Sequence, residues 1–301
     1  MEKQIAQEPD VIFADKDRDK AQIEELWNVC FGDDKEYVDF YMEHRMTQDN
    51  MLAVFIDGKM VSMASMLPAE YQMENEMIRA RYVYAVATLP QYRNRGLAAK
   101  ILDAAKKIYR EPLFLEPASE KLCSYYEKLG FAKAFHASDG LNEWIPAPEA
   151  KYKEFPETGI LQDNCAEQWK TAEQIVKEQQ VEWYQQLRDT HFQKDGYVRW
   201  DREAISYALE ENSYCGGEVR FFFKENREHP EDFLMYQKHE NQLEVLETTL
   251  SGSRREEACS RLCGETHTVC YRNRTHAGMI WLPEGQKAKL PEQGYLNLTL
   301  G

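Results

Sequence analysis

Apolar and polar residues follow two different periods along the chain, and each period predicts one kind of element. Where apolar residues recur every three to four positions, we expect helices with one buried face. These stretches are 16–31, 35–46, 95–109, 118–129, 164–193, 201–211 and 253–263. Short apolar runs bounded by turn residues predict strands. They are 10–14, 51–56, 59–67 with an extension over 69–73, 77–88, 112–116, 131–136, 140–146, 218–224, 233–238, 242–250, 266–272, 278–282 and 295–300.

This order of elements predicts an α/β fold, with a mixed sheet whose front half is mostly antiparallel (an α+β arrangement). The dipeptide Asp57-Gly58 lies between two apolar runs and predicts a tight hairpin. The back half of the chain repeats the front half in outline, as helices, a meander, one helix and further strands. No residue-by-residue repeat accompanies this similarity.

The length of 301 residues suggests two domains, at about 150 residues per domain. Residues 146–159 contain three prolines and show no apolar period, which is typical of a linker. We therefore predict a first domain over 1–147, a linker over 148–160 and a second domain over 161–301.

Composition narrows the classes of protein. Hydrophobic residues make up 43% of the chain, enough for a packed core, and the formal net charge is −15. Such an acidic chain is a poor binder of nucleic acid, because that affinity comes from Lys and Arg. The absence of about 18 consecutive apolar residues argues against a membrane span, and no secretory leader is evident. Seven scattered cysteines favour a reducing, cytoplasmic compartment over a disulfide framework. The oligomeric state stays open.

The most informative stretch is 83–102, where an apolar strand ends near Thr88 and a helix begins at about Arg95–Gly96. Backbone amides at a helix N-terminus face outward and attract anions, and the helix dipole helps. Gly96 and Ala98 allow a phosphate to approach the backbone closely, and Arg93 and Arg95 add positive charge. The alternative is an ordinary helix start with two solvated arginines.

Two strings in this region resemble one known family. Arg93-Asn94-Arg95-Gly96-Leu97-Ala98 resembles the Q/R-x-x-G-x-G/A signature of the GNAT superfamily of N-acetyltransferases. The segment 124–131, S-Y-Y-E-K-L-G-F, is similar to the superfamily motif F-Y-E-K-L-G-F. The resemblance covers about 10–146. The tandem layout resembles acetyltransferases of the enhanced-intracellular-survival type, in which a second, degenerate GNAT-like domain follows and only the first binds the cofactor.

The resemblance implies acetyl-CoA as co-substrate. It implies that the backbone of Val86, Ala87 and Thr88 pairs with the pantetheine arm. It also implies that the pyrophosphate lies on backbone amides, those of Arg93, Asn94, Arg95, Gly96, Leu97 and Ala98. Ser119 stands where the superfamily often has an Asn that contacts the cofactor. These implications place the cofactor in the first domain.

Tyr126 matches the general acid of the family, which protonates the departing thiolate. A phenol with an ordinary pKa of about 10 is protonated at neutral pH and suits this role. The alternative for Tyr126 is an amphipathic core tyrosine.

For the general base, Glu116 is the first candidate because it ends the strand that the resemblance puts beside the thioester. Its alternative is a surface carboxylate near the start of the next helix. Glu70 and Tyr84 are weaker candidates, and the C-terminal carboxylate at Gly301 is a further route, as in the two-domain relatives.

The second half holds a Cys/His cluster, Cys259-x3-Cys263-x3-His267-x2-Cys270. Zinc needs four converging ligands. The C-x2-C spacing is missing, and His267 and Cys270 would point to opposite faces of a strand. We therefore predict no metal site. The segment Ser251-Gly252-Ser253 lacks the cofactor signature, so we expect one cofactor site per chain.

The sequence thus predicts a cytoplasmic acetyl-CoA-dependent N-acetyltransferase. The acceptor would be the primary amine of a small molecule or peptide, and the acidic chain would suit a cationic one. We expect neither a nucleic acid nor a membrane as partner. The alternative function is a non-catalytic acyl-CoA-binding regulatory module.

Overall fold

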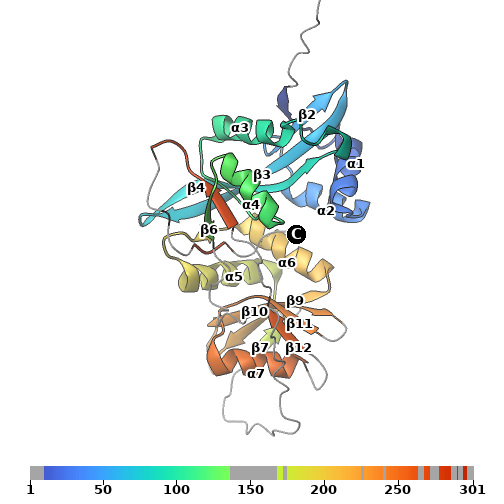
Figure 1. Ribbon diagram of the computed structural model, residues 1–301. Coiled ribbons are helices and arrows are strands. Elements are labelled where there is room, and N and C mark those ends of the chain that lie inside the picture. The colour runs from blue at the N-terminus through green and yellow to red at the C-terminus, as the bar shows by residue number, and fades with distance from the viewer. Residues whose placement is uncertain are drawn as a thin grey trace, which may run out of the picture.

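A computed structural model describes residues 10–135, 168–171, 175–224, 227–239, 242–263, 268–271, 278–285, 290 and 294–296. These residues form two β-sheets with helices packed on and between them (Figure 1). The fold is a mixed α/β fold, as the sequence predicts.

The first sheet holds eight of the described strands, in the order β1-β2-β3-β4-β5-β13-β6, with β8 paired to β3. Neighbouring strands are antiparallel except β4 and β5, which are parallel. The strands are β1 (Val11–Phe13), β2 (Met51–Ile56), β3 (Lys59–Met73), β4 (Glu76–Thr88), β5 (Leu113–Leu115), β6 (Ala132–Phe135), β8 (Val198–Arg199) and β13 (Gly278–Trp281).

Helix α3 covers one side of this sheet, and α1 and α2 lie on the other side (Figure 1). The apolar face of α3 is buried, as its period predicts: Leu97, Ile101, Leu102 and Ala105. The helices around this sheet are α1 (Lys20–Phe31), α2 (Lys35–Arg45), α3 (Leu97–Tyr109) and α4 (Glu120–Lys128), with a short 3-10 helix over Pro90–Tyr92.

Helix α1 begins four residues later than predicted, at Lys20 instead of residue 16. The Oδ1 atom of Asp15 accepts hydrogen bonds from the backbone N–H groups of Asp17 and Arg18, at 3.0 and 2.8 Å. This side chain stabilises a turn that competes with the helix. The helix therefore starts only after the turn.

The second sheet has the order β12-β11-β10-β9-β7. Its strands are β7 (Gln168–Thr171), β9 (Gly217–Phe223), β10 (Asp232–His239), β11 (Gln242–Thr248) and β12 (Thr268–Tyr271), and its helices are α5 (Lys177–Phe192), α6 (Arg202–Tyr214) and α7 (Gly252–Cys263). The order repeats β1-β2-β3-β4-β5 of the first sheet. In both sheets the last of these pairs is parallel and is joined through a helix, α3 or α7.

The predicted helix over 164–193 is wrong in its first part, because 168–171 form strand β7 and the helix begins only at Lys177. The backbone of 168–171 pairs with residues 220–223 of β9, and these bonds replace the helical ones. Apolar residues such as Trp169, Ile175 and Val176 fit a helical period as well as a strand, so spacing alone could not separate the two.

Strand β13, predicted at 278–282, lies between β5 and β6 of the first sheet, and its red ribbon stands beside β6 in Figure 1. The predicted strand over 295–300 is described only at its start, where Tyr295 forms a single bridge with Tyr197. The predicted strand 140–146 and linker 148–160 lie outside the described residues. The domain boundaries stay a prediction, although the first sheet includes strands from beyond residue 160.

Buried aromatic contacts join the two parts of the chain. The ring of Trp200, just after β8, lies 5.4 Å from that of Tyr82 and 5.8 Å from that of Phe114. Helix α6 contacts α2 on one side and α5 and β9 on the other. Helix α6 therefore connects the two sheets.

Candidate active site

Strands β4 and β5 separate after a short paired region. Their parallel register includes only Arg81 with Leu113 and Tyr82 with Phe114. Within the described residues, β4 is paired from Val83 to Thr88 with β3 alone. One edge of the strand end is therefore open to hydrogen bonding by a ligand.

A β-bulge lies in this open part of β4. Ser65 faces Tyr84 and Met63 faces Ala87, so that two residues of β4 stand opposite one residue of β3. Ala85, inside the bulge, has a φ of 52°. An alanine in this left-handed region costs roughly 1–2 kcal/mol. Strain of this kind often accompanies functional sites because it re-aims backbone groups.

The end of β4 is held by side chains from two directions. The hydroxyl of Ser62 donates to the carbonyl oxygen of Ala87 at 2.8 Å and contacts Oγ1 of Thr88 at the same distance. Nε of Arg93 donates to the carbonyl oxygen of Thr88 at 3.0 Å. The strand end is thus fixed in place beside the loop that follows it.

The loop enters α3 through two left-handed residues, Asn94 with φ 62° and Gly96 with φ 74°. Gly96 is the N-cap, and no side chain caps the helix there. A Cβ atom at Gly96 would meet nothing within 4 Å. The first turn of α3 therefore has backbone amides without a side-chain cap and open space before them, which is what a phosphate needs.

The two arginines of the motif are tied to the loop itself. Arg93, which is exposed, binds Thr88 and also brings Nη2 to 4.0 Å from Sγ of Cys30 on α1. Nη2 of Arg95 donates to the carbonyl oxygen of Gln91 at 3.2 Å, and its guanidinium lies 5.0 Å from the ring centre of Tyr92. Their positive charge adds to the field of the helix N-terminus, while their side chains shape the loop.

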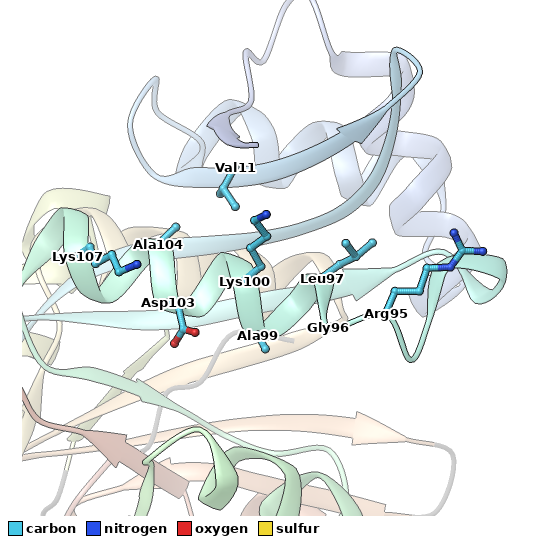
Figure 2. A pocket seen from close by; sticks show the side chains of 9 residues that line it. All are labelled: Val11, Arg95, Gly96, Leu97, Ala99, Lys100, Asp103, Ala104 and Lys107. Carbon is cyan, nitrogen blue, oxygen red and sulfur yellow. The ribbon is translucent and has the colours of Figure 1, made fainter. Parts of the chain in front are cut away.

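A hollow of about 660 Å³ runs along α3 from this loop (Figure 2). Three cationic side chains line it, Arg95, Lys100 and Lys107, with a single carboxylate, Asp103. Asp103 forms an ion pair with Lys106 at 3.1 Å. In Figure 2, Lys100 points toward Val11 of β1, and Asp103 points the other way. In an acidic protein this local excess of positive charge favours an anionic ligand.

Tyr126 lies on α4 and is 6% exposed. Its ring contacts those of Tyr125, at 5.3 Å, and Phe131, at 5.7 Å. Burial raises the pKa of Tyr126 well above its ordinary value, so the phenol keeps its proton. Its protonation suits a general acid, and its packing also fits the alternative of a core tyrosine.

The other candidates occupy more ordinary positions. Ser119 is the N-cap of α4, where its side chain accepts a hydrogen bond from the amide of Leu122. Glu116 follows the end of β5 and is partly buried. Oε2 of Glu70 pairs with Nη1 of Arg199 at 2.7 Å. Gly301 lies outside the described residues, so the route through its carboxylate stays a prediction.

A hydrogen-bonded cluster that the sequence analysis missed lies where α6 meets α2. The hydroxyl of Tyr37 donates to Oε1 of Glu211 at 2.5 Å and lies 3.3 Å from the hydroxyl of Tyr84. Tyr207 also donates to Oε1 of Glu211, at 3.3 Å. Tyr37 and Glu211 are 174 positions apart, and no local pattern marks either of them.

The second sheet has a bulge at the matching place on β11, where Leu246 is the extra residue. The next residue, Glu247, is buried with Arg188, whose Nε lies 3.1 Å from its carboxylate. Tyr184 and Tyr295 donate to the same carboxylate, at 2.5 and 2.8 Å. In the second sheet the residue after the bulge is thus enclosed by side chains.

The cysteine cluster is only partly described. Cys259 is a buried free thiol. The side chains of Cys263 and Cys270, and all of His267, lie outside the described residues. Within the described part of the chain, no three His, Cys, Asp or Glu side chains are placed to hold a metal ion. The expectation of no metal at this cluster stays a prediction.

Part of the chain resembles a known family in sequence, and most of it resembles solved structures in fold. Residues 14–134 match the acetyltransferase (GNAT) domain family. The fold is similar to a protein from Enterococcus faecalis described as a probable N-acyltransferase (TM-score 0.65, 13% identity, 93% of this chain and 74% of that chain). It is also similar to a GCN5-related N-acetyltransferase from Anabaena variabilis (0.66, 12%, 90% and 72%). Eis1 from Mycobacterium abscessus is a third (0.60, 10%, 91% and 73%). The search of curated proteins gave no match.

The matched residues 14–134 include the open end of β4, the loop from Arg93 to Ala98 and helix α4. The chain thus contains an acetyltransferase domain of the GNAT superfamily. Among the described residues, no helix is long and apolar enough to cross a membrane.

Proposed function

We propose that the protein transfers the acetyl group of acetyl-CoA to the nitrogen of a primary amine. GNAT domains generally use acetyl-CoA. One observation carries the proposal: the open edge of β4 after Tyr82 lies next in sequence to a helix N-terminus without a side-chain cap. An open strand edge can pair with the amides of a pantetheine arm, and the helix amides can bind a pyrophosphate.

The residues present fit this co-substrate. Backbone groups of Val86, Ala87 and Thr88 would align the arm, and the amides from Arg93 to Ala98 would bind the pyrophosphate. The positive hollow along α3 suits the remaining phosphate. Ser119 is a weaker contact, because its side chain already caps α4.

Three groups would serve the chemistry of the first domain. A backbone N–H at the bulge around Ala85 would stabilise the negative charge that develops on the carbonyl oxygen. Tyr126 would give its proton to the leaving thiolate. Glu116 stays a candidate base at the end of β5. The amine nitrogen would attack the thioester carbon directly.

We further propose that the second half is a degenerate GNAT-like domain that shapes the acceptor pocket where the halves meet. The repeated strand order and the repeated bulge support this. The enclosed Glu247 supports one cofactor site per chain. The acceptor would be a small-molecule or peptide amine.

Calorimetry with acetyl-CoA and a thiol-release assay over a panel of amines test the proposal. Binding at micromolar concentration with thiol release supports the transferase. Binding without release from any amine favours the non-catalytic regulatory module. Absence of binding by the folded protein would remove the co-substrate assignment.

A further inference from the structure

The cluster at the junction of α2, β4 and α6 connects the bulge of β4 with the second half of the chain. Tyr84 comes directly before Ala85, the strained residue of the bulge. Its hydroxyl contacts that of Tyr37, and Tyr37 donates to Glu211 on α6. A continuous line of hydrogen-bonding groups therefore runs from the strand that would hold the thioester to a carboxylate of the other half.

Aromatic rings surround the Tyr84 end of this line. The ring centres of Trp27, Tyr41 and Tyr82 lie 5.4–5.9 Å from that of Tyr84. Faces of aromatic rings attract cations, most strongly where water is excluded. These three rings are buried, whereas at the Glu211 end Phe40 stacks on Tyr207 and on Tyr214, which is 54% exposed. An acceptor with an apolar body would therefore meet aromatic surface near Glu211.

The protonation of the tyrosines fixes the direction of the hydrogen bonds. Burial raises the pKa values of Tyr37, Tyr84 and Tyr207 far above the ordinary value. The phenols therefore stay neutral and act as donors. Glu211 receives two of these bonds on Oε1, and a carboxylate oxygen is the usual partner of an ammonium group.

Other contacts already hold α2 against α6. Phe40 stacks on Tyr207 with ring centres 5.1 Å apart. Nε2 of His44 lies 3.6 Å from Glu210, and Nη1 of Arg45 lies 3.8 Å from Asp201. Attachment of the helices does not depend on the carboxylate of Glu211 alone.

We propose that Glu211, aided by the hydroxyl of Tyr37, binds the ammonium group of the acceptor and takes a proton from it, in place of the candidate base Glu116. The inference rests on the proposed acetyl transfer and specifies its acceptor. That acceptor is a primary amine on an apolar or aromatic body, without a carboxylate of its own. A carboxylate on the acceptor would be repelled by Glu211.

The protons balance in the following way. The ammonium gives one proton to the carboxylate of Glu211, and the neutral nitrogen forms the C–N bond with the thioester carbon. The C–S bond breaks, and the thiolate takes the proton of Tyr126. The nitrogen loses its second proton, which restores Tyr126 through solvent, while Glu211 releases its own proton to solvent. One proton is released for each acetyl group transferred.

The test uses the full chain, acetyl-CoA and two matched probes, 2-phenylethylamine and phenylalanine, which differ by one carboxylate. In Glu211→Gln, the side-chain oxygen still accepts from Tyr37 and Tyr207, so the variant should fold.

We expect thiol release with 2-phenylethylamine to exceed that with phenylalanine at least tenfold. We expect kcat/KM for 2-phenylethylamine to fall at least 50-fold in Glu211→Gln, with an unchanged Kd for acetyl-CoA. In Tyr37→Phe, kcat/KM for 2-phenylethylamine should fall about tenfold. Glu210→Gln is the matched control one position away. Its kcat/KM for 2-phenylethylamine should stay within twofold of the wild-type value.

Several outcomes would overturn the inference. Wild-type turnover in both Glu211→Gln and Tyr37→Phe would do so and would leave the proposed acetyl transfer intact. A preference for phenylalanine, or no release with 2-phenylethylamine by a protein that binds acetyl-CoA, would also exclude this acceptor site. Failure of the wild type to bind acetyl-CoA would remove the proposed function and the inference together.

Discussion

Ile280 of β13 lies directly opposite Phe114 of β5, although the two residues are far apart in the sequence. On its other side Ile280 faces Ala132 of β6. The end of the chain therefore completes the sheet that begins at its start. Among the described strands, β6 pairs with β13 alone, whereas β5 pairs with both β4 and β13.

We predict that Ile280→Ala lowers the free energy of unfolding by about 2–5 kcal/mol, because Ile280 is 1% exposed and its removal leaves a cavity. Chemical denaturation followed by circular dichroism measures the change. Ile108→Ala is the matched control, since Ile108 is 47% exposed and its truncation should cost less than about 0.5 kcal/mol.

A chain that ends at residue 147 lacks β13 and should show no cooperative unfolding transition. A cooperative transition in that fragment would show that β13 is dispensable.

We predict that Gly96→Val raises the Kd for acetyl-CoA at least tenfold, since a side chain would fill the space before the helix amides. Calorimetry measures the change. Gly58→Val is a matched control, because Gly58 has a φ of 76° and also meets nothing within 4 Å. It should suffer similar backbone strain in the β2–β3 hairpin and keep the wild-type Kd. Equal effects of both variants would mean that strain, and not the loop, explains the loss.

We predict that Tyr126→Phe lowers kcat by about 10²-fold with little change in the Kd for acetyl-CoA, as typical of the loss of a general acid. Because burial raises the pKa of Tyr126, the wild-type rate should show no loss from ionisation of this phenol up to about pH 10. Thiol-release assays at a series of pH values measure both kcat and its dependence on pH. Tyr125→Phe, the neighbour on α4, should keep most of the activity. Full activity of Tyr126→Phe at every pH would exclude the assignment.

We predict that the protein loses stability as the pH rises above about 10, where phenols of the unfolded chain ionise. Burial raises the pKa of Tyr71, Tyr109 and Tyr236 to about 12, and those of Tyr41 and Tyr184 further. The folded state then keeps protons that the unfolded state releases, so ionisation favours unfolding. For a fully buried phenol the loss reaches at most ~1.4 kcal/mol per pH unit.

Thermal melts between pH 8 and 11 check this dependence. Tyr41→Phe should show a shallower decline of Tm over the same range, because one buried phenol no longer contributes. A Tm that stays constant up to pH 11 would contradict the prediction.

The sequence by itself determined most elements of the first half and the glycine at which the loop enters α3. These features depend on local chemistry, such as the apolar face of α3, the Asp57-Gly58 turn and the glycine at the start of a helix. The loop from Arg93 to Ala98 could be proposed as a binding site because such a loop is built from adjacent residues. Where a side chain binds backbone N–H groups, as Asp15 does before α1, the helix begins later than its apolar period predicts.

Only the tertiary structure decided the features that join distant parts of the chain. Strand β7 took the place of predicted helix because pairing with β9 satisfies its backbone. Strand β13 belongs to the first sheet because β5 and β6 both form backbone hydrogen bonds with it. Tyr37 met Glu211 because α6 packs against α2. Local periodicity records which face of an element is buried, whereas it carries no information about which distant element covers that face.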